Sequence, residues 1–414
     1  MKVLTINAFN YRKGGSETVM FNIGELLREH GHEVVHFALK WPENLPDGNS
    51  VYFPESKETR SGRLRSVKNV VNYFYHFEAA RKLDELIEKE RPDIAQIHLI
   101  WGQLTPSVLR VLRRRGIPAV LTVHDYRLIC PAYVLRDGSG RVCEQCRGHC
   151  FYKCVTNTCC RGSKGLSAMM AAEQYFRNAF FAPDKYLSGL LYVSDFARNI
   201  HLRYMPGLAD LPSARIYNFS KAIDPELSEK PDKRYYLYFG RLSAEKGVET
   251  LIKTFAGRPH LRLKLVGTGP EEERLRAFAA EHGVSNIEFV GYRTGKALED
   301  LVRGAYFVVV PSEWYENNPL TIIEAYSAAT PVIGSSIGGI PEIVDDGVTG
   351  FRFDCGNPAS LGSAVDKADA LDADAYEAMR ESALDFARDN FDREAYYASL
   401  IDFFGRVIAE RKSK

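Results

Sequence analysis

The feature that most constrains the fold of this chain is a repeated order of apolar segment, glycine-containing loop and amphipathic segment. Near the start, residues 2–8 are predicted to form a buried strand, Gly14 and Gly15 follow it, and apolar residues then recur at helical spacing. Residues 34–39 make a second short apolar segment. A strand, a loop, a helix and a strand in this order form a βαβ unit, which belongs to a parallel sheet.

The same order recurs in two arrays, one on each side of residue 234. In the first array, Ser16 is predicted to cap the first helix and Gly31 to end it, and further strands are predicted at residues 93–99 and 119–124. The second array is predicted to hold five strands, at residues 235–239, 261–266, 287–290, 306–310 and 331–334. The sequence therefore predicts an α/β protein with two domains, each built on a parallel sheet.

Composition marks the boundary between the two arrays. Residues 221–234 contain prolines and charges but little apolar content, which is typical of an interdomain linker. We therefore predict an amino-terminal domain at residues 1–220 that contains a cysteine-rich insertion at residues 130–165. A carboxy-terminal domain is predicted at residues 235–390, and a carboxy-terminal helix at residues 391–414.

Charge and hydropathy exclude several classes of protein. The 414 residues carry 54 Lys and Arg against 53 Asp and Glu, a formal net charge of +1. This balance argues against a duplex-DNA binder, whose affinity depends on excess cations, and no nucleic-acid partner is expected. No apolar run reaches the ~20 residues of a membrane-spanning helix. The start lacks the basic region and apolar stretch of a signal peptide, so we expect a cytoplasmic protein.

Candidate ligand-binding residues follow the strands of the second array. Arg241 and its neighbour Gly240 come directly after a predicted strand, and Lys246 lies five residues further on. Open parallel sheets bind ligands at the carboxyl ends of their strands, where Arg and Lys can hold a diphosphate. Gly267 and Gly269 predict a second sharp turn at this edge. The pattern lacks the glycines of a dinucleotide fingerprint and the Gly-Lys-Ser/Thr of a Walker A loop.

A helix start flanked by carboxylates is the most informative segment. Asn318 is predicted to be the N-cap of a helix whose first residue is a proline. The N–H groups of Leu320 and Thr321 then point out of the helix N-terminus, where they favour a phosphate. Glu316 precedes this helix, and Glu324 lies in its second turn. Carboxylates accept hydrogen bonds from paired hydroxyls, so both suit a sugar or a ribose.

These motifs resemble glycosyltransferase family 4 over nearly the whole chain. The resemblance rests on Gly-Gly-Ser-Glu, Gly-Arg…Glu-Lys-Gly, Gly-Thr-Gly-Pro, Glu-x7-Glu and Gly-Gly-Ile-Pro-Glu, which occur in the order and spacing of the family. It implies the GT-B fold, in which two Rossmann-like domains face a central cleft. It also implies a retaining, hexosyltransferase-type enzyme without a catalytic metal, acting in bacterial-type polysaccharide or glycoconjugate synthesis.

The resemblance implies roles for individual residues. Arg241 and Lys246 match the pair that binds the donor diphosphate, Glu316 matches the glutamate that contacts the sugar hydroxyls, and Glu324 matches the one that binds the donor ribose. His124, at the end of a predicted strand, matches a histidine near the sugar and the acceptor. The other donor-binding positions that it implies are Gly14, Gly15, Gly267, Tyr292, Asn317, Asn318, Leu320 and Thr321.

The sequence does not fix the nucleotide, the sugar or the acceptor. The resemblance implies a UDP- or GDP-sugar donor and a saccharide or polyprenyl-linked acceptor. A basic and aromatic stretch matches a surface by which family members reach lipid-linked acceptors at the inner face of the membrane, although a solvated helix with one buried face explains it equally well. This stretch comprises Arg60, Arg63, Arg65, Lys68, Val70, Val71, Tyr73, Phe74 and Phe77. The alternative function is a sugar-nucleotide epimerase of GT-B shape.

Cysteines are concentrated in one segment, since seven of the eight lie between Cys130 and Cys160. Disulfides are rare in cytosolic proteins, so the spacing favours a thiolate-bound metal: a structural zinc ion ahead of an iron–sulfur cluster. A cluster of buried free thiols is the alternative. A subset of family 4 carries a similar segment after the same His-Asp-Tyr. That resemblance supports four ligands, namely Cys143, Cys146, Cys154 and Cys159.

Overall fold

The computed structural model describes residues 1–56, 67–224 and 235–413, and the chain divides into two compact units. Within the predicted linker, positions 225–234 lie outside the described residues. The chain passes from the first unit to the second after Ile216 and returns to the first at Tyr397, inside helix α16 (Arg393–Ser413). The first unit comprises Met1–Ser139, Cys143–Ile216 and Tyr397–Lys414, and the second comprises Gly140–Val142 and Tyr217–Tyr396.

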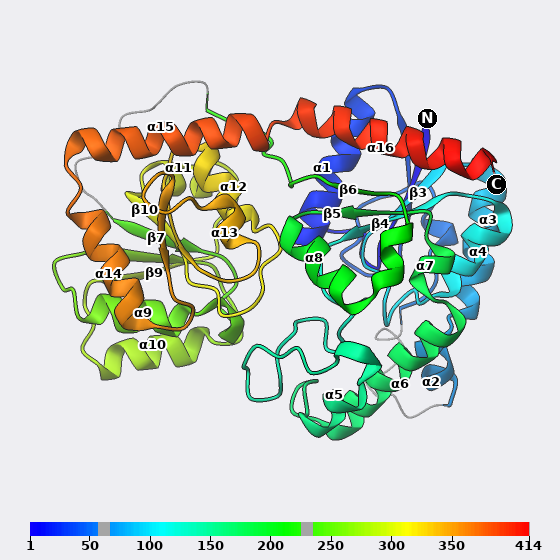
Figure 1. Ribbon diagram of the computed structural model, residues 1–414, viewed down its shortest axis with the longest axis horizontal. Coiled ribbons are helices and arrows are strands. Elements are labelled where there is room, and N and C mark those ends of the chain that lie inside the picture. Colours follow the sequence, from blue (N-terminus) through cyan, green and yellow to red (C-terminus); the bar gives the residue numbers. More distant parts are fainter. Residues whose placement is uncertain (57–66, 225–234, 414) are drawn as a thin grey trace. The chain divides into compact units, whose positions relative to one another are not determined.

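The first unit is built on a parallel sheet whose six described strands have the order β2-β1-β3-β4-β5-β6 (Figure 1). The central strands β3 and β4 are buried along their whole length, as expected of a parallel sheet with both faces covered. The strands are β1 (Lys2–Ile6), β2 (Glu33–Phe37), β3 (Ile94–Ile97), β4 (Ala119–Val123), β5 (Gly189–Tyr192) and β6 (Ser213–Arg215). The helices are α1 (Gly15–Glu29), α2 (Val67–Phe74), α3 (Phe77–Glu90), α4 (Ser107–Arg115), α5 (Tyr152–Thr156), α6 (Lys164–Phe180), α7 (Pro183–Tyr186) and α8 (Asp195–Tyr204).

The end of α16 forms part of the core of the first unit. Leu400, Phe403 and Phe404 are completely buried. A Cβ atom on Gly189 in β5 would lie 3.0 Å from Cζ of Phe403, closer than most such contacts, so this strand position favours glycine. The last residues of the chain therefore stabilise the sheet that the first residues begin.

The second unit also contains a parallel sheet, whose described strands have the order β12-β11-β10-β7-β8-β9. Its strands are β7 (Tyr236–Phe239), β8 (Leu263–Val266), β9 (Ile287–Gly291), β10 (Phe307–Val310), β11 (Val332–Ser335) and β12 (Gly350–Phe353). Its helices are α9 (Val248–Ala256), α10 (Glu272–Glu281), α11 (Lys296–Arg303), α12 (Leu320–Ser327), α13 (Ile340–Ile343), α14 (Pro358–Asp369) and α15 (Ala373–Asn390).

Strand β7 divides the interior of the second unit into two apolar clusters. Tyr236 and Tyr238 pack with residues of α9, α10 and α14, whereas Leu237 and Phe239 pack with residues of α12 and α13. Alternate residues of a strand point to opposite faces, so helices cover both faces of this sheet. The second unit is therefore a doubly wound α/β domain.

The strand order of each sheet reverses at one point. In the first unit β1 lies between β2 and β3, and in the second β7 lies between β8 and β10. Open α/β sheets bind ligands outside the carboxyl ends of the strands at such a reversal. The loops after β1 and β3, and those after β7 and β10, are therefore the places where each unit is expected to bind a ligand.

The predicted α/β class with two parallel sheets is confirmed, with local differences. Strands β5, β6 and β12 were not predicted. Helix α1 begins at Gly15, after Gly14, and has no side-chain cap, so the prediction of Ser16 as its cap was wrong. Ser16 Oγ instead donates to Oε2 of Glu17 at 3.1 Å. Gly31 adopts φ +77° just after the helix, as predicted for its end.

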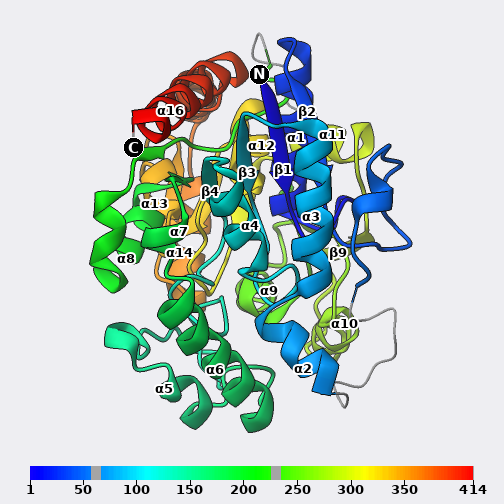
Figure 2. The same cartoon turned by 90° about the vertical axis from the view of Figure 1, so that its right-hand side faces the viewer.

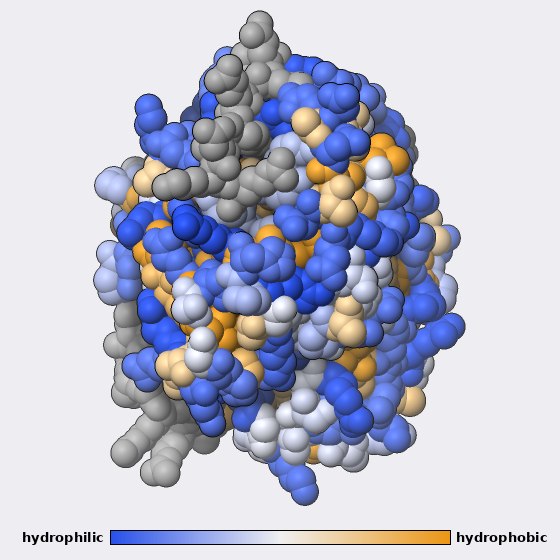
Figure 3. Space-filling model, turned by 90° about the vertical axis from the view of Figure 1, so that its left-hand side faces the viewer, coloured by the Kyte–Doolittle hydropathy of each residue, from blue (hydrophilic) through white to orange (hydrophobic). Residues whose placement is uncertain are grey.

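None of the described helices combines the length and the apolar character needed to cross a bilayer. The face drawn in Figure 3 is mainly hydrophilic, and its apolar side chains lie in small separate groups.

Candidate functional site

In the second unit, the loops after β7 and β8 approach each other closely. The Gly240 N–H donates to Val266 O at 3.0 Å, and the Leu242 N–H donates to Thr268 O at 2.9 Å. Gly267 has φ +134°, and a Cβ atom there would collide with the carbonyl oxygen of Gly240, so this turn requires glycine. The predicted role of Gly267 in a sharp turn at the sheet edge agrees with this geometry. Arg241 is exposed on the same loop.

An ion pair joins the loop after β7 to the loop after β10. Lys246 Nζ lies 2.6 Å from Oε1 of Glu316, a residue that is only 6% exposed. Ser312 Oγ donates to the same carboxylate oxygen at 2.7 Å. The Lys246 ammonium also lies 5.3 Å from the ring centroid of Trp314. The two residues predicted to act on donor phosphate and sugar are therefore held together at the reversal of the strand order.

The charge of Glu316 is fixed by these partners. Burial acts to raise the pKa of its carboxyl group. The attraction of Lys246 and the hydrogen bonds from Lys246 and Ser312 outweigh burial, so the pKa lies below its usual value. Glu316 is therefore a carboxylate at neutral pH and acts as a hydrogen-bond acceptor.

The helix predicted after this loop begins one position later than expected. Helix α12 starts at Leu320, and Pro319 is the residue before its first turn; no side chain caps it. The prediction of Asn318 as the N-cap was therefore wrong. Asn318 Oδ1 instead accepts from the N–H of Asn218 at 2.8 Å, and Asn218 Nδ2 donates to Asn318 O at 3.2 Å. Asn318 thus anchors the loop to a distant segment, which leaves the first N–H groups of α12 without a side-chain cap.

Glu324, in the second turn of α12, has an unusual acidity. The residue is exposed, yet the surrounding protein desolvates its carboxyl group. This desolvation, together with the nearby charge of Glu299, raises the pKa of Glu324 to about 7. Its ionisation therefore changes close to neutral pH, unlike that of Glu316.

The remaining predicted donor-binding residues lie at the same ends of the strands. In the second unit, Tyr292 is 68% exposed and follows β9, and Asn317 is buried between Glu316 and the start of α12. In the first unit, the exposed residues Gly14 and Gly15 lie at the start of α1, after β1. Each unit thus presents its predicted residues after strands at or near the reversal, and their roles in binding stay predictions.

His124 is the predicted site residue in the loop after β4. Burial lowers the pKa of this histidine to about 4, so its imidazole is neutral at pH 7. Its Nε2 atom lies 2.8 Å from Nδ1 of His98, which follows β3. His98 was not predicted from the sequence, and neither were Ser312 and Asn218. Ser312 and His98 also follow strands, which was the available signal, whereas nothing local marked Asn218.

The predicted metal site is not assembled in the structure. The predicted ligands were Cys143, Cys146, Cys154 and Cys159. Within the described ranges, no three His, Cys, Asp or Glu side chains form a group that could hold a metal ion. Cys154 Sγ lies 3.8 Å from Sγ of Cys160, a residue left out of that set. The Cys160 N–H donates to Ser167 Oγ of α6 at 3.1 Å, and this bond helps to place Cys160 against Cys154.

The stretch predicted to face a membrane is only partly described. Arg60, Arg63 and Arg65 lie outside the described residues, as does the side chain of Lys68. Of its apolar residues, Val70, Val71 and Phe77 are exposed, whereas Tyr73 is buried and bonded to Arg127. The described part of the stretch is therefore divided between surface and interior.

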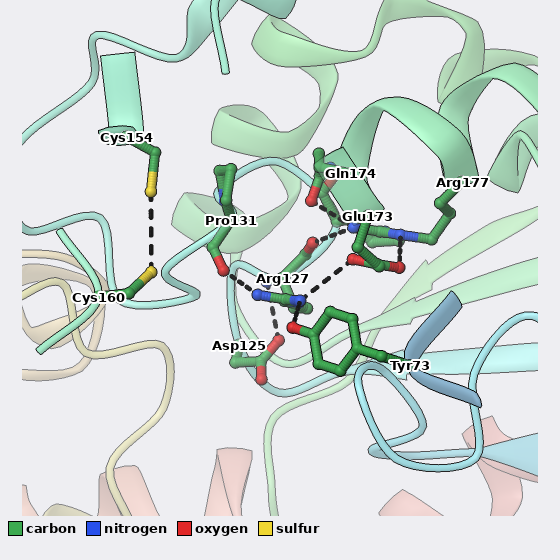
Figure 4. A network of polar contacts seen from close by, with 10 residues as sticks. Tyr73, Asp125, Arg127, Pro131, Cys154, Cys160, Glu173, Gln174 and Arg177 are labelled. Carbon is green, nitrogen blue, oxygen red and sulfur yellow. Dashed lines mark hydrogen bonds and ion pairs between the residues drawn. The ribbon is translucent and has the colours of Figure 1, made fainter. Parts of the chain in front are cut away.

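A buried polar network ties the loop that follows β4 to helix α6 (Figure 4). Arg127 Nη2 donates to the hydroxyl of Tyr73 at 3.1 Å and to Oε2 of Glu173 at 3.1 Å. Arg177 Nε donates to the other oxygen of Glu173 at 3.2 Å. Glu173 and Arg177 are completely buried, so one carboxylate stabilises two guanidinium groups away from water.

The same network holds the backbone of the loop. Arg177 Nη2 donates to Arg127 O at 2.8 Å, Gln174 Nε2 donates to Leu128 O at 2.5 Å, and Arg127 Nη1 donates to Pro131 O. Figures 1 and 2 show α5 and α2 beside α6 at one end of the first unit. The loop that begins with His124 is therefore held in position by side chains of α6.

We predict that Glu173→Gln destabilises the protein by about 3–5 kcal/mol, because it leaves two buried guanidinium groups without their shared carboxylate. Chemical denaturation measures this change. The matched control is Glu85→Gln, which removes an exposed partner of Arg81 and is expected to cost less than about 1 kcal/mol. Equal losses for the two variants contradict the assignment of Glu173 as the centre of the network.

Comparison with protein families matches both halves of the chain to glycosyltransferases. The family described as "Glycosyltransferase Family 4" matches residues 13–151, and the family described as "Glycosyl transferases group 1" matches residues 219–385. The uncharacterized glycosyltransferase MJ1178 of Methanocaldococcus jannaschii is 30% identical over 276 residues, which cover 67% of this chain and 65% of that protein. The uncharacterized glycosyltransferase MJ1607 of the same organism is 33% identical over 154 residues, 36% of this chain and 38% of that protein. The chain thus spans between two fifths and two thirds of these relatives.

Solved structures share the fold over nearly the full length. Sucrose-phosphate synthase of Thermosynechococcus elongatus superposes with a TM-score of 0.71 at 18% identity and covers 99% of each chain. The Anabaena protein HepE in complex with UDP and glucose gives a TM-score of 0.66 at 18% identity, covering 98% of this chain and 100% of the other. These likenesses bear on the fold, whose two parallel-sheet domains are those of the GT-B type. The predicted family is confirmed: the chain belongs to the glycosyltransferases that combine a family 4 amino-terminal domain with a group 1 carboxy-terminal domain.

Proposed function

We propose that this protein is a retaining glycosyltransferase that transfers a hexosyl group from a nucleotide-sugar to a saccharide or polyprenyl-linked acceptor. The observation that carries the proposal is the Lys246–Glu316 ion pair at the strand-order reversal of the second unit. Lys246 lies on the loop that also bears the exposed Arg241. Two cations and a buried carboxylate at that edge suit a diphosphate joined to a sugar. Membership of the glycosyltransferase family supports glycosyl transfer as the class of reaction.

In the proposed reaction, the second unit binds the donor. Arg241 and Lys246 bind the diphosphate and stabilise the negative charge that develops on it as the sugar leaves, without a metal ion. The N–H groups of Leu320 and Thr321 at the start of α12 lie where a phosphate is favoured. Glu316, held as a carboxylate, accepts hydrogen bonds from the sugar hydroxyls.

Transfer with retention requires attack on the same face from which the nucleotide leaves. The acceptor oxygen forms a bond to the anomeric carbon, and the bond from that carbon to the diphosphate oxygen breaks. The acceptor proton passes to the departing phosphate oxygen, so both products are complete. The first unit is proposed to contribute Gly14 and Gly15 beside the diphosphate and His124 beside the sugar and the acceptor.

The donor is proposed to be a UDP- or GDP-sugar. The HepE structures contain UDP, UDP and glucose, or UDP-glucose, which favours a UDP-sugar. The acceptor is proposed to belong to polysaccharide or glycoconjugate synthesis, in the cytoplasm or at the inner face of the membrane. A sugar-nucleotide epimerase is the alternative, and it is distinguished by its product, since it changes the donor without forming a new glycosidic bond.

We expect the purified protein to hydrolyse or transfer sugar from at least one member of a panel of UDP-, GDP- and ADP-sugars. Arg241→Ala and Glu316→Gln are expected to lower kcat by about 100- to 1,000-fold, because each removes stabilisation of the transition state. Soluble saccharides and polyprenyl-linked saccharides serve as separate acceptor arms.

The control for these variants is Arg388→Ala, which removes an exposed arginine of α15 that pairs with Asp385. It is expected to keep the wild-type rate. Unchanged turnover in Arg241→Ala, or an isomerised donor as the only product, contradicts the proposed function.

We predict that the KM for the donor depends on the ionisation of Glu324. With a pKa of about 7, its carboxyl group is protonated below neutral pH and then cannot accept hydrogen bonds from both ribose hydroxyls. The KM for the donor should therefore rise about tenfold between pH 8 and pH 6, as the ionised fraction falls from about nine tenths to one tenth. Glu324→Gln should bind the donor weakly at both values. A KM for the wild type that does not change over this range contradicts the role of Glu324.

A structural zinc ion in the cysteine-rich segment stays a prediction from the sequence. Its support is the donor set, because Cys130, Cys143, Cys146, Cys154, Cys159 and Cys160 lie near enough to affect one another's pKa values. The predicted ligands are four of these, Cys143, Cys146, Cys154 and Cys159, and four thiolates suit tetrahedral zinc. We expect metal analysis to find about one zinc per chain, lowered in Cys154→Ser and kept in Cys355→Ser. Less than roughly 0.2 zinc or iron per chain removes this prediction.

A further inference from the structure

Two histidines lie side by side at the carboxyl ends of neighbouring strands in the first unit. His98 follows β3, His124 follows β4, and these strands pair in parallel. His98 Nδ1 lies 2.8 Å from His124 Nε2, and the two rings are nearly parallel, with centroids 5.1 Å apart. His98 is 2% exposed and lies after the strand next to β1, at the reversal of the sheet.

Both imidazoles are uncharged at neutral pH. Burial holds the pKa of His98 well below its usual range, and the nearby His124 and His36 lower it further. Burial lowers the pKa of His124 to about 4. His36 on β2 is also neutral, because burial and then the charge of Arg28 lower its pKa to about 4. The contact between His98 and His124 is therefore one hydrogen bond between two neutral rings, with a single proton between them.

The surroundings of His98 indicate which ring supplies that proton. Its Nε2 atom is buried and has no hydrogen-bond partner among the residues that the structure describes. An N–H group at that position leaves a buried donor unsatisfied, a situation that folded proteins rarely tolerate. The proton of His98 is therefore assigned to Nδ1, which donates to Nε2 of His124. The proton of His124 is then on its own Nδ1.

We propose that His98 is a positioning residue that fixes His124 as the Nδ1–H tautomer. Because Nε2 of His124 is occupied as an acceptor, that nitrogen does not act as a general base, and the proton that His124 can donate is the one on Nδ1. The oxygens that such a donor recognises are a sugar hydroxyl or a phosphate oxygen. This role in transfer rests on the proposed function, whereas the tautomer itself does not.

Nitrogen-15 NMR of histidine-labelled protein tests the tautomer without any assay of activity. In the wild type, we expect His124 at pH 7 to carry its proton on Nδ1. His98→Leu removes the Nδ1–H donor and fills the site with an apolar side chain. We then expect the proton of His124 to redistribute to Nε2. His98→Asn places an amide donor near the position of Nδ1 and should restore the wild-type tautomer.

The matched control is His201→Leu. His201 is another completely buried histidine of the first unit, and its Nδ1 contacts Ala197 O at 2.7 Å. Its replacement costs stability through the same loss of a buried ring, but it should leave the tautomer of His124 unchanged. A wild-type His124 protonated on Nε2, or a tautomer that stays the same in His98→Leu, overturns the proposal.

Kinetics separates the positioning role from a structural one. We expect kcat to fall on the order of 10- to 100-fold in His98→Leu, with the KM for the donor nearly unchanged, and to recover to within about fivefold in His98→Asn. His201→Leu should keep kcat despite its lower stability. Equal kcat losses in His98→Leu and His201→Leu overturn the proposed role of His98. If the wild type shows no transfer at all, the proposed function fails, while the NMR result still decides the tautomer.

Discussion

The reversal of strand order within each sheet is the constraint on which the rest of the structure depends. Strand β1 lies between β2 and β3, and β7 lies between β8 and β10, so both neighbours of each come later in the chain. The chain therefore leaves each of these strands toward one side of the sheet and later returns to the other side. The loops at that point diverge over opposite faces and leave the carboxyl edge open to a ligand. The Lys246–Glu316 pair and the His98–His124 pair both lie next to such an opening, one in each unit.

Buried charge serves two different purposes in the two units. Lys246 and Glu316 form a pair in which the lysine is partly exposed, so its cation remains available to an anionic ligand. Arg127 and Arg177, in contrast, are buried around Glu173 and bind backbone carbonyls. The first arrangement is suited to chemistry, and the second fixes a loop. The net charge of +1 gives no indication of either arrangement.

The parts of the fold that could be predicted are those determined by short stretches of sequence. Apolar runs such as residues 306–310 and glycines such as Gly31 predicted strands and helix ends, because hydrophobic periodicity and turn conformation act over a few residues. Strand β6, with the sequence Ser-Ala-Arg, has no apolar run and was missed. The partners of Asn318 and Glu316 lie 100 and 70 residues away, and only the folded sheet brings them together. The motifs predicted candidate site residues, whose roles in binding stay predictions, but they did not predict the contacts that hold these residues in place.

Four consecutive residues after β4 illustrate how the predicted chemistry depends on distant parts of the chain. His124 forms a hydrogen bond with His98, which follows the neighbouring strand β3, and Arg127 is bound by Tyr73 and Glu173, 54 residues upstream and 46 downstream. The short loop has little freedom of its own, since Asp125 accepts from the Arg127 N–H at 2.9 Å. Its position is therefore set from both ends. The cysteine-rich segment and α6 follow this loop in the chain, and Glu173 of α6 binds Arg127 within it (Figure 4), so the position of the loop depends on α6 as well as on β4.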